Sequence, residues 1–166
     1  FAGEIGHTVV DPNGRLCGCG KKGCLETYAS ANGIRRTVEE LKTLSTTPSL
    51  LRSIPFDQLT SKDVYDAAVQ GDAIAREAFE VTGKYLGMKL ADAVAHTSPE
   101  AIILFGGVTD AGELIFEPTK RWMEKFLFPI FRNKVKILSS GLPRGTAAIL
   151  GAAALSWNEL EKAGNS

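Results

Sequence analysis

Three cysteines and one histidine near the start of the chain have the types and spacing of a metal-binding set. Cys17, Cys19 and Cys24 lie within eight residues of one another, and His7 precedes the first by ten positions. Three thiolates and one imidazole form a Cys₃His set, which Zn²⁺ binds with tetrahedral geometry. Because the protein itself would fill all four positions, we expect these residues to hold a structural zinc ion that is closed to water.

The residues between the cysteines favour a metal site over two other interpretations. Gly18, Gly20 and Gly23 allow the close turns that a short segment needs to wrap around one ion. Lys21 and Lys22 can partly offset the negative charge of three thiolates. The alternatives are incidental thiols without a metal and a redox pair, which the lack of Cys-x-x-Cys spacing disfavours. The odd, clustered cysteines also do not suit a secreted disulfide framework.

Two carboxylates flank the cysteine cluster. Glu4 lies three residues before His7, so one turn can direct both side chains at the same ligand, and Glu26 follows Cys24 by two residues. A carboxylate accepts strong, charge-assisted hydrogen bonds from hydroxyl groups. An imidazole fixed on a metal through one nitrogen keeps its other N–H free to donate. The other interpretation of Glu4 and Glu26 is that they are solvated surface residues.

The middle of the chain has helical spacing. The β-branched residues at 8–10 predict a short strand, and a turn is expected at 11–14. The spacing of apolar residues then predicts a helix over 25–41. Thr60 resembles the N-cap of a helix reaching Val69, and Asp72 can cap a longer helix that ends near His96.

Strands and helices alternate in the last third of the chain. An unbroken apolar run over 101–105 predicts a buried strand that ends at Gly106-Gly107. A helix over 114–128, a strand over 135–138 and a helix over 147–160, opened by Gly145-Thr146, are expected to follow. This order predicts a parallel α/β layer.

Composition narrows the class of protein further. The chain has 166 residues, 44% hydrophobic and 23% charged, which fits one globular domain or one lobe of a larger protein. Its net charge is zero, so the chain lacks the broad positive field that is expected of a nucleic-acid-binding protein. Its apolar runs are shorter than the roughly 18 residues of a membrane helix.

One segment resembles a known family. Gly3-Glu4-Ile5-Gly6-His7, the turn at 11–14 and Cys17-x-Cys19-Gly20-x-x-Gly23-Cys24-Leu25-Glu26 closely resemble the ROK family of bacterial sugar kinases and related repressors. The resemblance implies an α/β fold of the ribonuclease-H-like (actin/hexokinase-like ATPase) class. Residues 1–166 would then be the C-terminal lobe, with a sugar-contact segment and zinc knuckle (1–28), a mainly helical insertion (29–97) and an α/β nucleotide-side part (98–166).

The resemblance also implies roles for single residues. It assigns His7, Cys17, Cys19 and Cys24 as zinc ligands, Glu4, His7 and Glu26 as contacts to sugar hydroxyls, and Gly106 and Gly107 as the glycine pair beside the nucleotide. Taken alone, a glycine pair after a strand equally fits a simple turn.

The function implied is that of an ATP-dependent hexose kinase, specifically a glucokinase that phosphorylates the sugar 6-hydroxyl with ATP and Mg²⁺. Family members carry the general base, an Asp, and the phosphate loops in an N-terminal lobe. Since this chain begins with Phe1 and lacks those motifs, we expect it to be inactive alone. The alternative is the effector-binding domain of a ROK-type sugar-responsive repressor, and a third possibility is a zinc-stabilised interaction module. We expect a cytoplasmic homodimer.

Overall fold

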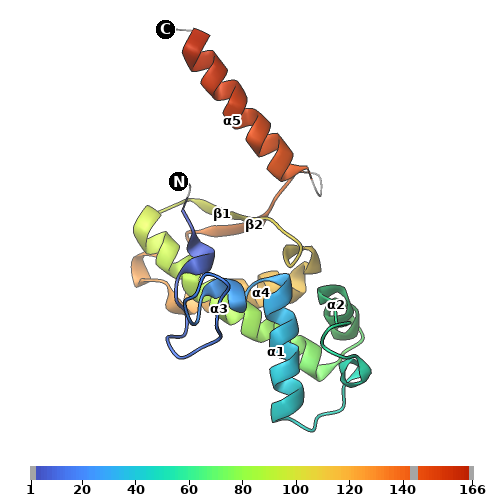
Figure 1. Ribbon diagram of the computed structural model, residues 1–166. Helices are drawn as coiled ribbons and strands as arrows, with labels where there is room; N and C mark the ends of the chain where they lie inside the picture. The colour runs from blue at the N-terminus through green and yellow to red at the C-terminus, as the bar shows by residue number, and fades with distance from the viewer. Residues whose placement is uncertain (1–2, 143–145, 165–166) are drawn as a thin grey trace.

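The computed structural model describes residues 3–142 and 146–164, in which helices dominate (Figure 1). The helices are α1 (Ala31–Leu44), α2 (Ser61–Val69), α3 (Ala73–Thr97), α4 (Glu113–Phe126) and α5 (Ala147–Gly164), and the strands are β1 (Ala101–Leu104) and β2 (Lys136–Ser139). Short 3₁₀ turns join them at η1 (Ile5–His7), η2 (Leu25–Thr27), η3 (Leu50–Ser53), η4 (Thr109–Ala111) and η5 (Pro129–Phe131). Gly145, expected to open the last helix, lies outside the described residues.

Helices α2 and α3 begin at the residues predicted to cap them. The Thr60 hydroxyl accepts a hydrogen bond from the Asp63 amide, and the Asp63 carboxylate accepts one from the Thr60 amide, which forms a capping box. The Asp72 carboxylate likewise accepts from the Ala75 amide at 3.0 Å. Helix α3 ends at Thr97 because Ser98 adopts a left-handed conformation, with φ of 46°.

The first long helix begins later than predicted. Leu25 to Thr27 form the separate turn η2, and α1 starts at Ala31 with Ser30 as its N-cap. Gly33 lies in the first turn of α1, where an added Cβ would be 2.7 Å from the carbonyl carbon of Tyr28. This close approach packs η2 against the start of α1, so the chain turns between them instead of continuing as one helix.

Helix α3 packs along α4, and two glycines bring them close. A Cβ on Gly83 would lie 2.7 Å from Pro118, and one on Gly87 would lie 2.5 Å from the Thr119 carbonyl. Two apolar clusters form around α3: one joins its first half to α1 and α2, and the other joins its second half to α4 and the strands. Helix α3 therefore packs against α1 and α2 at one end and the strands at the other, and its Thr82 hydroxyl donates to the Tyr28 carbonyl just after η2 at 3.4 Å.

The strands pair in parallel, as predicted, with Ala101 opposite Lys136. The prediction that the first strand is buried was wrong: Ile103 is 65% exposed and Phe105 51%. Side chains alternate across a strand, and here Ile102 and Leu104 pack on the second cluster while Ile103 faces away from it. Among the described residues, one face of the sheet is covered and the other is open.

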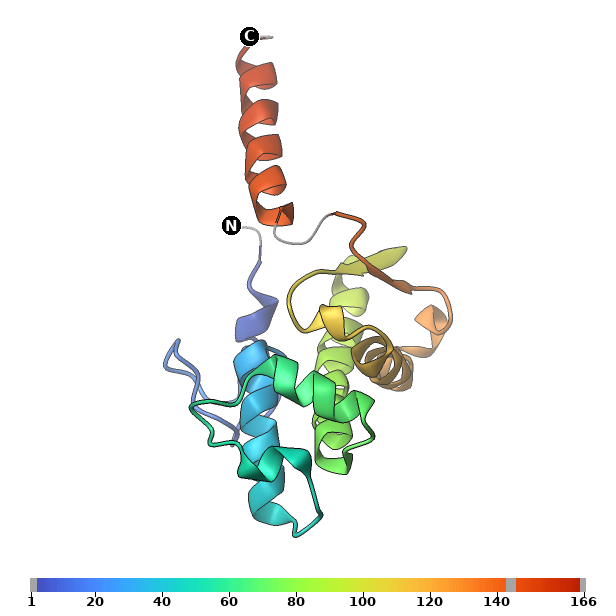
Figure 2. The ribbon, with the colours of Figure 1, turned by 90° about the vertical axis from the view of Figure 1, so that its right-hand side faces the viewer.

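Helix α5 stands apart from the other helices in both views (Figures 1 and 2). It exposes large apolar side chains, among them Leu155 and Trp157. Within residues 3–142 and 146–164, every helix falls short of the length and apolar character that crossing a membrane requires.

Candidate metal and sugar site

The knuckle is a short, irregular loop and not a strand. The strand expected at 8–10 is reduced to a single bridge between Val9 and Cys24, and a second bridge joins Leu16 to Lys22. Gly23 adopts a φ of +70°, and a Cβ there would lie 1.6 Å from the Asp11 carbonyl oxygen. The backbone therefore folds onto itself too closely for a regular hairpin, and this brings the two ends of the cysteine segment together.

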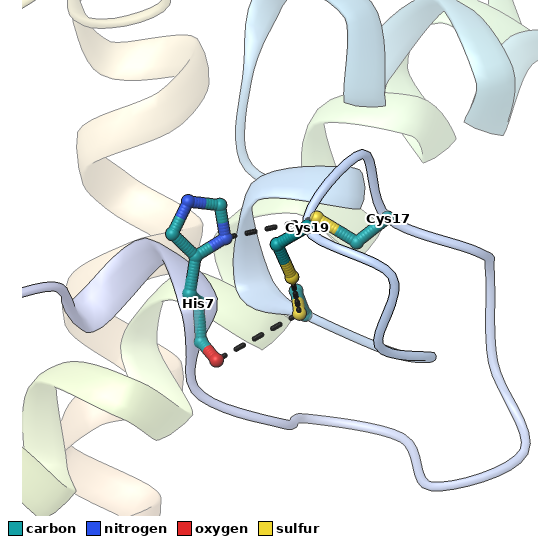
Figure 3. A group of neighbouring side chains, drawn as sticks. His7, Cys17 and Cys19 are labelled. Atoms are coloured by element: carbon teal, nitrogen blue, oxygen red, sulfur yellow. Dashed lines mark hydrogen bonds between the residues drawn. The ribbon is translucent and has the colours of Figure 1, made fainter.

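The four predicted ligands converge in space (Figure 3). Their ligand atoms all lie within 4.8 Å of one another, and the set comprises His7, Cys17, Cys19 and Cys24. The Cys19 and Cys24 sulfurs are 3.6 Å apart, and the Cys17 sulfur is 3.7 Å from His7 Nδ1. Bonds of about 2.0–2.3 Å to a tetrahedral zinc ion require separations of roughly 3.5–3.8 Å between ligands. The donor set and these two distances therefore fit Zn²⁺.

The environments of two of the thiols differ. A hydrogen bond from the Lys21 backbone lowers the pKa of Cys19 to about 7. Burial raises the pKa of Cys24 to about 11. A metal at this site would bind thiolates, so its binding would displace protons from these sulfurs.

His7 and Glu26 lie side by side at the edge of the cluster. His7 Nδ1 is 3.5 Å from Glu26 Oε2, and the Cys17 sulfur lies 3.7 Å from the same oxygen. Nδ1 faces the sulfurs, while the other ring nitrogen points away from them (Figure 3). The arrangement thus presents an imidazole nitrogen and a half-exposed carboxylate on the outer side of the cluster.

The Glu4 side chain lacks the described contacts that join the other two predicted sugar contacts, His7 and Glu26. It directly precedes the turn η1, and its carbonyl accepts a hydrogen bond from the His7 amide at 3.1 Å. Its side chain is exposed, and no contact described in this structure joins its carboxylate to His7 or Glu26. The structure therefore brings His7 and Glu26 together and leaves Glu4 nearby along the chain.

Gly106 and Gly107 border an open hollow of about 1070 Å³ at the end of β1, far along the chain from the knuckle. Gly106 has a φ of +126°, which disfavours any other residue, and a Cβ on either glycine would meet no atom within 4 Å. A flat ligand can therefore approach the backbone at this point. Charged side chains of α4, including Glu117 and Lys120, line the same hollow.

Two basic residues make hydrogen bonds next to the site that the sequence did not predict. Lys21 is predicted to offset thiolate charge, and in the structure its Nζ donates to the His7 carbonyl at 2.6 Å. Arg15 was not singled out, although it lies buried between the turn and Cys17. A buried arginine beside a ligand segment could have been suspected from its position, but its partners are distant in sequence.

The family follows from comparison with known proteins. The model of the ROK family matches residues 1–159, and the chain therefore belongs to the ROK family. A glucokinase of Halalkalibacterium halodurans is 41% identical over 133 residues, which cover 78% of this chain and 40% of that protein.

Relatives of two kinds share this region. The transcriptional dual regulator NagC of Escherichia coli K12 is 33% identical over 153 residues, covering 92% of this chain and 36% of that protein. The crystal structure of a ROK glucokinase from Streptomyces griseus, in complex with glucose and AMPPNP, superposes with a TM-score of 0.81 at 34% identity, covering 93% of this chain and 51% of that one. The chain thus spans about half the length, or less, of these relatives, and its fold is that of the actin/hexokinase-like ROK sugar kinases.

Proposed function

We propose that this chain is the C-terminal lobe of an ATP-dependent glucokinase that phosphorylates the sugar 6-hydroxyl. The observation that carries the proposal is the His7–Glu26 pair held beside the Cys₃His cluster. The similarity of the chain to known glucokinases supports glucose as the substrate. The boundaries at 1–28, 29–97 and 98–166, the homodimer and the cytoplasmic location are part of the same proposal.

Each residue of the site has a defined task in this proposal. The Glu26 and Glu4 carboxylates accept hydrogen bonds from ring hydroxyls, and the outward nitrogen of His7 donates to a sugar oxygen. His7, Cys17, Cys19 and Cys24 would hold Zn²⁺, whose contribution is to stiffen the knuckle and fix the imidazole tautomer.

The nucleotide would lie at the carboxyl end of β1. The bare backbone of Gly106 and Gly107 lets a purine nucleotide lie against the hollow that they border. In the whole enzyme the γ-phosphoryl group of ATP passes to the sugar oxygen, and the hydroxyl proton passes to a base outside this chain. Mg²⁺ would neutralise the charge of the phosphates.

A second candidate is the effector-binding domain of a ROK-type repressor. The match to NagC over 92% of the chain favours it, because a repressor can use the same sugar contacts to sense its effector. The two candidates differ in phosphoryl transfer and not in sugar binding. Formation of glucose 6-phosphate by the full-length protein with glucose, ATP and Mg²⁺ would establish the kinase, whereas glucose binding without turnover would favour the repressor.

The substitution Glu26→Gln tests the sugar site in either case. It keeps the shape of the side chain but removes the charge, so the dissociation constant for glucose should rise at least about tenfold. Isothermal titration calorimetry on the full-length protein measures this change. Glu77→Gln, on the exposed side of α3, is the matched control and should bind glucose normally. Unchanged affinity in Glu26→Gln would remove Glu26 from the site.

A further inference from the structure

Arg15 is a buried cation whose hydrogen-bonding capacity is fully used. The residue is 8% exposed, and each of its five side-chain N–H groups has an acceptor. Nε and one N–H of Nη2 donate to the two carboxylate oxygens of Glu40, at 2.8 and 2.6 Å. The remaining donors reach the Thr27 carbonyl at 2.5 Å, the Gly33 carbonyl at 3.0 Å and the Thr37 hydroxyl at 2.8 Å.

These partners belong to separate segments of the candidate site. Arg15 itself lies in the knuckle, and its carbonyl accepts a hydrogen bond from the Gly23 amide at 2.7 Å. Thr27 closes the turn η2, whose middle residue is Glu26. Gly33, Thr37 and Glu40 lie on α1. The guanidinium therefore joins the knuckle to the turn η2, which carries Glu26, and to helix α1.

The site requires an arginine and not merely a positive charge. The planar guanidinium makes a two-pronged pair with Glu40 while its other edge reaches two carbonyls, and it stacks 4.3 Å from the ring centre of Tyr28. A lysine ammonium carries three donors on one atom and cannot span these acceptors. No contact described here connects the Arg15 side chain to a cysteine sulfur, so its direct hold is on η2 and α1.

We propose that Arg15 is a positioning residue for glucose binding, which acts by holding the Thr27 carbonyl and thereby the neighbouring Glu26 against α1. This inference rests on the proposed function, since it assumes that Glu26 contacts the sugar. It adds a residue outside the ligand and sugar-contact sets, with a role that the metal does not share.

The test compares Arg15→Lys, Glu26→Gln and the double variant in the full-length protein, by calorimetry with glucose. Arg15→Lys should raise the dissociation constant about tenfold while the zinc content stays at that of the unaltered protein. In the Glu26→Gln background the same change should have little further effect, because the carboxylate it positions is gone. Arg52→Lys is the matched control: its guanidinium donates to the carbonyl of Lys42 in the last turn of α1 and to those of Ser45 and Thr47 just after it, and glucose affinity should not change.

Chemical rescue provides a second test if Arg15→Lys disturbs the packing of the protein. Arg15→Ala leaves a buried space, and millimolar guanidinium should restore part of its glucose affinity where the same concentration of urea does not. Arg15 variants with lowered thermal stability but unaltered glucose affinity would overturn the proposal, as would full additivity with Glu26→Gln or a loss of affinity that accompanies loss of zinc. Absence of glucose binding in the unaltered protein would instead overturn the proposed function, and this inference with it.

Discussion

Cys19 is the exposed member of the four candidate ligands, and its substitution tests the metal site most directly. Serine offers a poor zinc ligand, so Cys19→Ser should lower the zinc content from about one ion per chain. Because His7 belongs to both the proposed ligand set and the proposed sugar contacts, stability and glucose affinity should fall together. Metal analysis by mass spectrometry, thermal unfolding and calorimetry measure the three effects.

Lys22→Ser provides the control for Cys19→Ser, since Lys22 lies in the same loop and offers no ligand in the proposed set. It should keep both zinc and glucose affinity. A Cys19→Ser protein that keeps its zinc but loses only glucose binding would contradict a structural metal.

At the scale of the element, Asp72 fixes where α3 begins. Burial disfavours its charge, but hydrogen bonds from the Ala75 and Leu50 amides and the Ser49 hydroxyl outweigh that cost and lower the pKa of the carboxyl. A lowered folded pKa stabilises the protein fully above the unfolded aspartate pKa of about 3.9. That stabilisation is lost as the pH falls through the folded pKa.

The substitution Asp72→Asn should therefore lower the free energy of unfolding by about 1 kcal/mol at neutral pH, because the Asn NH₂ group cannot replace the carboxylate oxygen that accepts from the Leu50 amide. The difference from the unaltered protein should shrink as the pH falls below about 4. Urea unfolding followed by circular dichroism at a series of pH values measures it. Asp57→Asn, in an exposed loop, should change stability by less than about 0.5 kcal/mol. A cost for Asp72→Asn that is constant with pH would show that the charge has no part in the cap.

At the scale of the whole molecule, the groups that we propose bind sugar and nucleotide lie in two segments far apart in the sequence. The His7–Glu26 pair lies at the knuckle, and the Gly106–Gly107 pair lies at the end of β1. The motifs expected for the base and the phosphate loops find no match in the sequence, and the chain covers 40% of its glucokinase relative. Under the proposed function, phosphoryl transfer should therefore require a longer protein that supplies these motifs.

Expressed alone, residues 1–166 should form no glucose 6-phosphate from glucose, ATP and Mg²⁺ in a coupled assay, whereas the full-length protein should form it. Zinc content and circular dichroism of the shorter chain serve as controls for its folding. Turnover by the shorter chain would show that a base and phosphate contacts are present within it.

The sequence by itself determined the features that depend on near neighbours. The ligand spacing over Cys17–Cys24, the caps at Thr60 and Asp72 and the parallel strand order all follow from local chemistry and periodicity. For the same reason the motif at Gly3–His7 and Cys17–Glu26 was sufficient to predict the family, which the comparison confirms.

Only the tertiary structure decided which distant groups meet. It places Glu26 against His7 at 3.5 Å, and it gives Arg15 a partner in Glu40, 25 residues away. It also leaves Ile103 exposed where an apolar run predicted burial. The periodicity of a sequence shows which residues share a face of an element, but not what covers that face. Which charged side chains pair depends on where the helices lie. The exposure of Ile103 and the partners of Arg15 and Glu26 were therefore decided by the packed fold.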